Sequence, residues 1–102
     1  MTDTNPIQDF HGKVAIITGA SRGIGAAAAN ELAKRGATVV LASRTAHQIN
    51  ELAENIRSDG YKALAVACDV TRYSDCETVV KRCIDEFGRL DILVNNAGVS
   101  MA

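Results

Sequence analysis

The segment that most constrains the fold is a cluster of glycines, Gly19, Gly23 and Gly25, between two contrasting patterns. Residues 13–18 form a short β-branched run typical of a buried parallel strand, and residues 23–35 form an alanine-rich stretch typical of a helix. Glycine allows the backbone to approach a ligand closely, and a helix N-terminus offers free N–H groups and the positive end of a dipole. We therefore expect a strand–turn–helix unit whose turn binds phosphate. The alternative is a tight turn that binds no ligand.

The rest of the chain repeats this alternation. Strand patterns recur at 38–42, 62–67 and 90–94, and helical patterns lie between them. The resulting order β-α-β-α-β-α-β implies an α/β fold with a doubly wound parallel sheet and right-handed crossovers. We expect the strand order 3-2-1-4, with the first two helices on one face of the sheet and the third on part of the other. Residues 1–11 are expected to form a tail, and residues 12–102 the N-terminal part of the domain.

Local signals mark the ends of the helices. Capping boxes of the form T-x-x-Q and S-x-x-E begin at Thr45 and Ser74, and they predict the starts of the second and third helices. Gly36, Gly60 and Gly88 follow the three helical patterns. Glycine in this position supplies the left-handed conformation that commonly ends a helix.

Composition and charge exclude several classes of function. The 102 residues carry a formal net charge of −1 and no basic stripe, which argues against a nucleic-acid partner. No apolar run approaches the roughly 20 residues that cross a bilayer, and the polar start lacks the features of a secretory signal. Three cysteines without CxxC spacing fit a reducing compartment, so we expect a cytoplasmic protein without a structural disulfide. His11 and His47 are isolated, so we expect no metal site.

Three motifs together resemble the short-chain dehydrogenase/reductase family. The spacing T-G-x-x-x-G-x-G over residues 18–25 differs from the G-x-G-x-x-G fingerprint and matches the glycine motif of this family. Asp69-Val70 after the third strand and Asn95 to Gly98 after the fourth match two further family motifs. They occur in the family order and cover nearly the whole chain. The resemblance implies a Rossmann-type sheet and hydride transfer between a nicotinamide cofactor and a small carbonyl or alcohol substrate.

The end of the second strand bears on the choice of cofactor. In dinucleotide-binding folds an acidic residue there binds the ribose 2′-hydroxyl and selects NAD. Here the strand ends with Ser43 and Arg44, and Arg22 lies in the glycine motif. Guanidinium groups bind phosphate through charge-assisted hydrogen bonds, so we expect NADP(H) in preference to NAD(H). The alternative is that both arginines are solvated surface residues.

The family resemblance also implies roles for the remaining motif residues. Asp69 would accept a hydrogen bond from the adenine amino group beside Val70, although a simple loop cap is the alternative for this aspartate. Asn96 would lie beside the cofactor ribose, whereas Asn95 would tie the fourth strand to its neighbours, and Asp91 is expected to be structural. The complete set of predicted cofactor-binding residues is Gly19, Ser21, Arg22, Gly23, Ile24, Gly25, Ser43, Arg44, Asp69, Val70, Asn96, Ala97 and Gly98.

No catalytic residue can be assigned. The family uses a tyrosine followed four residues later by a lysine, but Tyr61 and Tyr73 are followed by Ala65 and Glu77. We interpret the chain as the N-terminal, cofactor-binding part of a longer subunit that forms a homo-oligomer, and we expect the part alone to lack catalysis. Its fourth strand would form an apolar edge that favours self-association.

Two alternative functions stay open at this point. One is a non-catalytic nucleotide-binding module or sensor. The other is an S-adenosylmethionine-dependent methyltransferase, which also uses a glycine loop after its first strand. The pair Ser43-Arg44 disfavours the methyltransferase, which usually has an acid at the end of the second strand.

Overall fold

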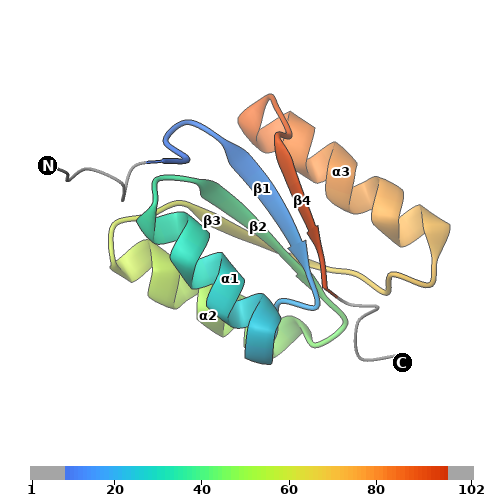
Figure 1. Ribbon diagram of the computed structural model, residues 1–102. Coiled ribbons are helices and arrows are strands. Elements are labelled where there is room, and N and C mark those ends of the chain that lie inside the picture. The colour runs from blue at the N-terminus through green and yellow to red at the C-terminus, as the bar shows by residue number, and fades with distance from the viewer. Residues whose placement is uncertain (1–8, 97–102) are drawn as a thin grey trace, which may run out of the picture.

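A parallel sheet of four strands forms the centre of the molecule (Figure 1). The computed structural model describes residues 9–96. The strands lie in the order β3-β2-β1-β4, as predicted. In chain order the elements are β1 (Val14–Thr18), α1 (Gly23–Lys34), β2 (Thr38–Ser43), α2 (Ala46–Ser58), β3 (Ala63–Ala67), α3 (Tyr73–Phe87) and β4 (Ile92–Asn95).

The two central strands explain why the sequence shows continuous apolar runs. In β1, Ile16 is paired with Val40 of β2 on one side and Leu93 of β4 on the other. Residues 14–17 and 39–42 are each at most 4% exposed, because both faces of these strands are covered. A strand buried on both faces needs apolar residues at every position rather than at alternate positions.

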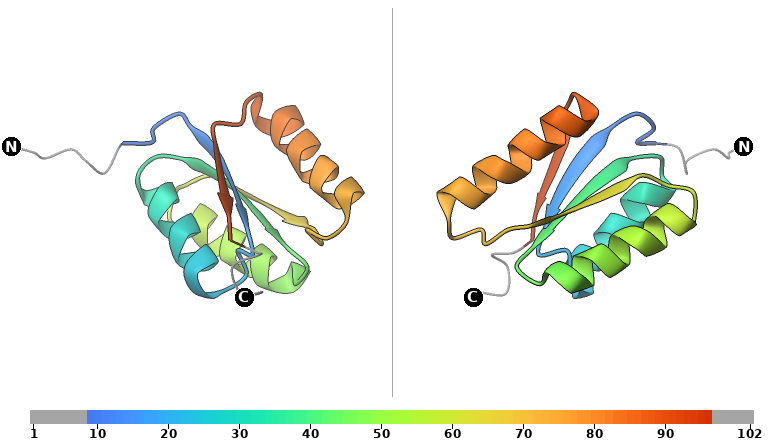
Figure 2. Two further views of the ribbon diagram at one scale, coloured as in Figure 1. Left: turned by 45° about the vertical axis from the view of Figure 1, so that its right-hand side comes forward. Right: turned by 180° about the vertical axis from the view of Figure 1, so that it is seen from behind.

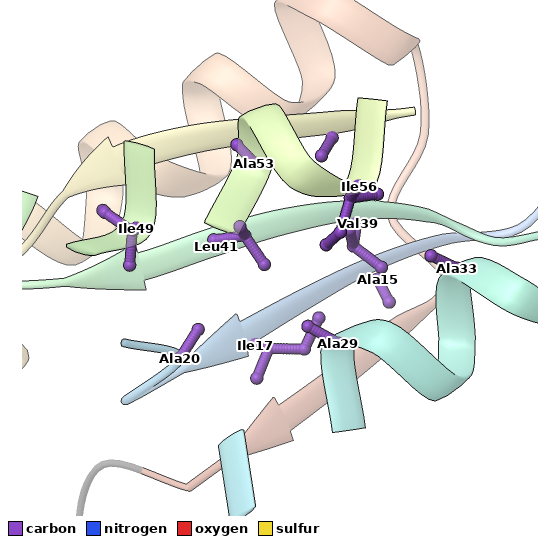
Figure 3. Close-up of a cluster of buried hydrophobic side chains, with 11 residues drawn as sticks. Ala15, Ile17, Ala20, Ala29, Ala33, Val39, Leu41, Ile49, Ala53 and Ile56 are labelled. Atoms are coloured by element: carbon purple, nitrogen blue, oxygen red, sulfur yellow. The ribbon is translucent and has the colours of Figure 1, made fainter. Parts of the chain in front are cut away.

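The helices divide between the two faces as predicted (Figure 2). Helices α1 and α2 cover one face, where Ala29, Ala33, Ile49, Ala53 and Ile56 pack on side chains of β1 and β2 (Figure 3). Helix α3 covers part of the other face through Val79 and Cys83. The small side chains of α1 let this helix lie close to the sheet, which brings its N-terminus to the end of β1.

The helix ends agree only in part with the predicted caps. Gly36, Gly60 and Gly88 have φ values of 100°, 92° and 79°, the left-handed conformation expected where a helix stops. At the start of α2, the Thr45 side chain makes no cap hydrogen bond, so the predicted capping box does not form. Instead, the Thr45 N–H donates to Ser43 Oγ at 3.1 Å.

The capping box predicted at Ser74 is wrong. Helix α3 begins at Tyr73 with Arg72 as its N-cap residue, so Ser74 already lies inside the helix. The preceding turn displaces the start, because the Arg72 N–H donates to the Asp69 carbonyl at 2.9 Å. Asp75 in the first turn of α3 accepts from the Asp69 N–H at 3.0 Å and ties that turn to the helix.

Asp91, directly before β4, joins the start of this strand to the start of β1. Its Oδ2 accepts from the Val14 N–H at 2.9 Å and from Arg89 Nε at 2.8 Å, and Oδ1 accepts from Arg89 Nη2 at 2.9 Å. These bonds lower the pKa of Asp91 to about 2, with the Arg89 hydrogen bond as the largest cause. Asp91 is therefore structural, as predicted. Leu93 on the same strand is 62% exposed, and among the described strands β4 lies at an edge.

None of the helices in residues 9–96 has the length and apolar character needed to span a membrane.

Candidate functional site

The segment from Gly19 to Gly23, which connects β1 to α1, is called the glycine turn below. A cleft of about 540 Å³ lies where this turn meets the ends of the strands. The chain passes from β1 to β2 and β3 on one side and returns to β4 on the other side of β1. Ligands of open α/β sheets bind at such a reversal, beyond the carboxyl ends of the strands. The described residues that line the cleft are Gly19, Ser21, Arg22, Gly23, Ile24, Ser43, Arg44, Thr45, Gln48, Cys68, Val70 and Asn96.

Nine of these twelve residues were predicted from the sequence, and Thr45, Gln48 and Cys68 were not. Thr45 and Gln48 were interpreted only as a capping box. Their position directly after the β2 end, one helical turn apart, could have identified them as neighbours of Arg44. Cys68 directly precedes the predicted Asp69. Gly25 and Asp69 were predicted but are not among the lining residues, and Ala97 and Gly98 lie outside the described residues.

The glycine turn depends on backbone conformation at two positions. Gly19 and Gly23 have φ values of 62° and 63°, which side-chain-bearing residues rarely adopt. A Cβ added at Gly23 would meet nothing within 4 Å, so this residue faces open space. The turn thus presents bare backbone to the cleft.

Gly25 has a different role, because it lets α1 pack against the turn itself. A Cβ there would overlap the Gly19 carbonyl oxygen and would lie 2.9 Å from Asn96 Nδ2. At this position no side-chain atom larger than hydrogen fits between α1 and the end of β1. This close packing explains why Gly25 lies behind the cleft surface rather than on it.

The N-terminus of α1 is electrostatically uncompensated in the described structure. Its first turn holds no acidic residue, and the N-cap residue Arg22 makes no side-chain cap hydrogen bond. The positive end of the helix dipole and its free N–H groups therefore favour an anion. Gly23 and Ile24 of this turn line the cleft, and Ile24 is 72% exposed. The arrangement can bind a phosphate group through main-chain donors.

The end of β4 is hydrogen-bonded to the same turn. Asn96 Nδ2 donates to the Gly19 carbonyl at 3.3 Å, and the Asn96 N–H donates to Thr18 Oγ1 at 2.9 Å. Thr18 Oγ1 also lies 3.2 Å from Asn95 Oδ1 and 3.4 Å from the Val94 carbonyl. Asn95 thus ties β4 to β1, as predicted, and Asn96 supports the glycine turn.

The other end of the cleft carries a charged side chain. Ser43 is 8% exposed, and its carbonyl accepts from the Cys68 N–H at 2.9 Å, which joins the ends of β2 and β3. Arg44 is exposed at this end and lines the cleft, and Arg22 is exposed and lines the cleft from the glycine turn. The described lining includes no Asp or Glu. This end of the cleft is therefore suited to a second anionic group.

Asp69 forms the loop cap that was the alternative to its predicted role at adenine. Its Oδ1 accepts from Thr71 Oγ1 at 2.6 Å and from the Thr71 N–H at 3.0 Å. These bonds lower the pKa of Asp69, and the charges of Arg44 and Arg72 act in the same direction. Val70 is 38% exposed and does line the cleft.

The tyrosines and histidines stand apart from this cleft. Tyr61 and Tyr73 are 37% and 79% exposed, and neither is among the lining residues. His47 lies exposed on α2. Within residues 9–96 no group of three or more His, Cys, Asp or Glu side chains could hold a metal ion. The described cleft offers groups for binding, but no side chain placed as a general acid or base.

Comparison with known proteins gives matches over most of the chain. Residues 13–102 match the family model described as short chain dehydrogenase. The chain is 50% identical to 11-beta-hydroxysteroid dehydrogenase A of Sesamum indicum, over 90% of this chain and 27% of the relative. It is 44% identical to the short-chain dehydrogenase/reductase FrzI of a Cladobotryum species, over 94% of this chain and 38% of the relative.

Solved structures agree with the architecture. A hydroxysteroid dehydrogenase from Escherichia coli superposes with a TM-score of 0.85 at 40% identity, covering 87% of this chain and 38% of that one. A glucose dehydrogenase of Caenorhabditis elegans gives a TM-score of 0.82 at 41% identity, covering 90% and 40%. The chain thus spans well under half the length of these relatives. By its glycine turn, its strand order and these matches, the chain belongs to the short-chain dehydrogenase family.

Proposed function

We propose that this chain is the NADP(H)-binding part of an oxidoreductase that interconverts a carbonyl and an alcohol. The observation that carries the proposal is that one cleft combines two regions suited to anionic groups. An uncompensated helix N-terminus with a bare glycine turn and the exposed Arg22 lies at one end, and the exposed Arg44 lies at the other, with no Asp or Glu among the described lining residues. The family binds nicotinamide dinucleotides, and the volume of about 540 Å³ suits a ligand of this kind.

The pyrophosphate would bind at the start of α1. The N–H groups of the first turn would donate to its oxygens, and the helix dipole would stabilise its charge. Gly19 and Gly23 would let these oxygens approach the main chain. Ser21 and Ile24 would flank the phosphates, and Gly25 would hold the helix in place behind them.

The adenosine 2′-phosphate would bind beside Arg44. An arginine can hold a phosphate through two parallel hydrogen bonds, and Arg22 would add a second positive charge. Ser43 would occupy the position at which an acid would repel this phosphate. Thr45 and Gln48 line the same end of the cleft and could donate further hydrogen bonds.

The remaining predicted contacts would hold the adenine and nicotinamide portions of the cofactor. Adenine would pack beside Val70, with Asp69 oriented by Thr71 at its edge. Asn96 would lie beside the nicotinamide ribose, followed by the predicted residues Ala97 and Gly98. When bound, the nicotinamide ring supplies or accepts a hydride. The chain's own residues then act only in binding and orientation, so we expect no turnover from this chain alone.

Titration of the chain with NADPH and with NADH, followed by cofactor fluorescence, tests the proposal. We expect NADPH to bind at least about tenfold more tightly, because each charge-assisted hydrogen bond contributes about 1.5–3 kcal/mol. Equal or tighter binding of NADH would refute the assignment of Arg44. Binding of neither cofactor would refute the nucleotide site as a whole.

A non-catalytic nucleotide-binding module remains the second candidate, favoured by the position of Tyr61 and Tyr73 outside the cleft. The two candidates predict different coding sequences downstream of the chain in its gene. A tyrosine followed four residues later by a lysine, encoded downstream in frame, would support the oxidoreductase. A stop codon directly after Ala102, together with NADPH binding, would support the module.

A further inference from the structure

Two cysteine side chains meet between α3 and the sheet. Cys68 follows β3 and is 4% exposed, whereas Cys76 lies near the start of α3 and is half-buried. Cys76 packs against the buried cluster that contains Cys68. Both side chains also line a cavity of about 220 Å³ beneath α3. The thiols are thus brought together by the fold although eight positions separate them in the chain.

The two thiols also interact with each other. Burial is the main cause that raises the pKa of Cys68 to about 11, and the neighbouring Cys76 thiol contributes. The Cys76 thiol further donates to the Val70 carbonyl at 3.6 Å. Both cysteines are reduced in this structure.

The main chain around the pair is held on both sides. The Cys68 N–H donates to the Ser43 carbonyl at 2.9 Å, and the Asp69 N–H donates to Asp75 Oδ2 at 3.0 Å. These bonds fix the end of β3 against β2 and fix the first turn of α3 against the loop. The loop therefore keeps the thiols close instead of letting them drift apart.

Cys83 provides a contrast on the same helix. It is fully buried, and its thiol donates to the Arg89 carbonyl at 3.4 Å. It lines neither the cleft nor the small cavity. A reaction that requires two neighbouring thiols and access from the cavity should therefore spare Cys83.

We propose that Cys68 and Cys76 form a redox-active thiol pair that low-molecular-weight disulfides, such as oxidised glutathione, convert into an intramolecular disulfide. The thiolate of Cys76, the more exposed residue, attacks one sulfur of oxidised glutathione. The glutathione S–S bond breaks, a Cys76–glutathione disulfide forms, and the first glutathione leaves as a thiol. Cys68 then loses its proton and attacks the Cys76 sulfur, and the second glutathione leaves and is protonated. Two protein thiols are oxidised and one disulfide is reduced to two thiols.

The pair lies where it can influence the cleft. Cys68 and Val70 line both the cleft and the small cavity. When the Cys76 sulfur bonds to Cys68, the thiol hydrogen is lost, and with it the hydrogen bond to the Val70 carbonyl at the cleft wall. This step rests on the proposed function: if the disulfide weakens NADPH binding, bound NADPH disfavours the disulfide at equilibrium by the same factor. We expect that factor to be about fivefold or more.

Mass spectrometry after equilibration with oxidised and reduced glutathione tests the thiol pair without reference to the cofactor. Trypsin cleaves after Lys62, Arg72, Lys81, Arg82 and Arg89, so each cysteine lies on its own peptide. We expect one disulfide that joins peptides 63–72 and 73–81 within a single chain. A stable glutathione adduct on Cys76, a link to Cys83 or a link between two chains would overturn the proposal.

Matched variants separate the pair from general thiol reactivity. The Cys83→Ala variant should form the same disulfide as the wild type, whereas Cys76→Ala and Cys76→Ser should form none. Circular dichroism of each variant checks that it is folded. Disulfide formation in Cys76→Ser, between Cys68 and Cys83, would show that the proximity of Cys68 and Cys76 is not what selects the bond, and would refute the proposal.

NADPH titration of the reduced and oxidised chain then tests the link to the cleft. Weaker binding by the oxidised form supports the link, and equal binding by both forms overturns it. If the reduced chain binds no NADPH, the proposed function fails, whereas the peptide map still decides whether the thiol pair exists. The two failures are therefore distinguishable.

Discussion

The two ends of the cleft are built in different ways. At the glycine turn, the surface is main chain, held from behind by Gly25 and tied to β4 through Asn96. At the β2 end, the surface consists of exposed side chains, chiefly Arg44, that are attached to a buried strand. In the proposed function the first end would bind through shape and the helix dipole. The second would bind through charge on side chains that can be replaced without disturbing the core. We therefore expect substitutions at the first end to affect folding and all nucleotides, and those at the second to affect selectivity alone.

The largest effect is expected from Gly25→Ala. The new methyl group would overlap the Gly19 carbonyl oxygen, and such overpacking costs about 1–3 kcal/mol. The better helix propensity of alanine returns only about 1 kcal/mol. Urea unfolding should show lower stability, and NADPH titration should show binding of neither NADPH nor NADH. Ala27→Ser, at an exposed position of the same helix, is the control. It should change neither the stability in urea nor the affinity for the two cofactors. Normal NADPH affinity in Gly25→Ala would break the distinction between the two ends.

Arg44→Ala should reduce the affinity for NADPH by about tenfold or more and leave NADH binding unchanged. The reason is that the lost guanidinium would contact only the 2′-phosphate. Thermal unfolding should remain as in the wild type, since Arg44 is exposed. Arg82→Ala removes the same charge from the exposed face of α3 and should leave both affinities unchanged. An equal loss of NADH binding in Arg44→Ala would mean that this end also determines general affinity.

The pH dependence of stability tests the anchoring of β4, the strand that positions Asn96 at the glycine turn. The folded-state pKa of Asp91 is about 2, below the ordinary value of 3.8. Stability from this carboxylate is therefore present above about pH 4 and is lost as the pH falls through about 2. Urea unfolding between pH 5 and pH 2.5 should show a smaller loss for Asp91→Asn than for the wild type.

Asp85→Asn is the control for this measurement. Asp85 pairs with Lys81 at 3.0 Å on the exposed face of α3, where such a pair contributes little. The free energy of unfolding of Asp85→Asn should fall with decreasing pH as much as that of the wild type. If Asp91→Asn were as sensitive to acid as the wild type, another carboxylate would have to anchor β4.

The smallest effect is expected from Leu93→Lys at the edge formed by β4. An exposed apolar edge strand favours pairing with another chain, and a lysine opposes it. Sedimentation at increasing concentration should show self-association of the wild type that Leu93→Lys reduces. Ile84→Lys, which alters an exposed apolar residue of α3, should reduce self-association less than Leu93→Lys does. A wild type that stays a cooperative monomer would contradict the expectation.

The sequence predicts the sheet and the glycine turn well because both depend on local rules. Continuous apolar runs define the buried strands, and Gly19, Gly23 and Gly25 are required by backbone conformation or by close packing. These constraints can be read without knowledge of the remaining structure. The strand order and the assignment of helices to faces then follow from handedness and from the family resemblance.

The remaining features depend on contacts between distant or competing groups. Ser74 has the right spacing for a capping box, but the turn at Asp69 displaces the start of α3. Cys76 packs against the cluster that contains Cys68 because of the same turn, which no spacing rule describes. Gln48 joins the cleft because α2 begins directly after β2, a boundary that sequence patterns locate only within a few residues.

The pairing of β1 with β4 also has a consequence for the order of folding. Strands β1, β2 and β3 are neighbours in the chain, but Val14 and Asp91 are separated by 77 positions. Long loops close slowly, so β4 should join the sheet after the other strands have paired. The glycine turn lacks its hydrogen bond from Asn96 until then. The cofactor would consequently bind late in folding and would stabilise only chains whose sheet is complete.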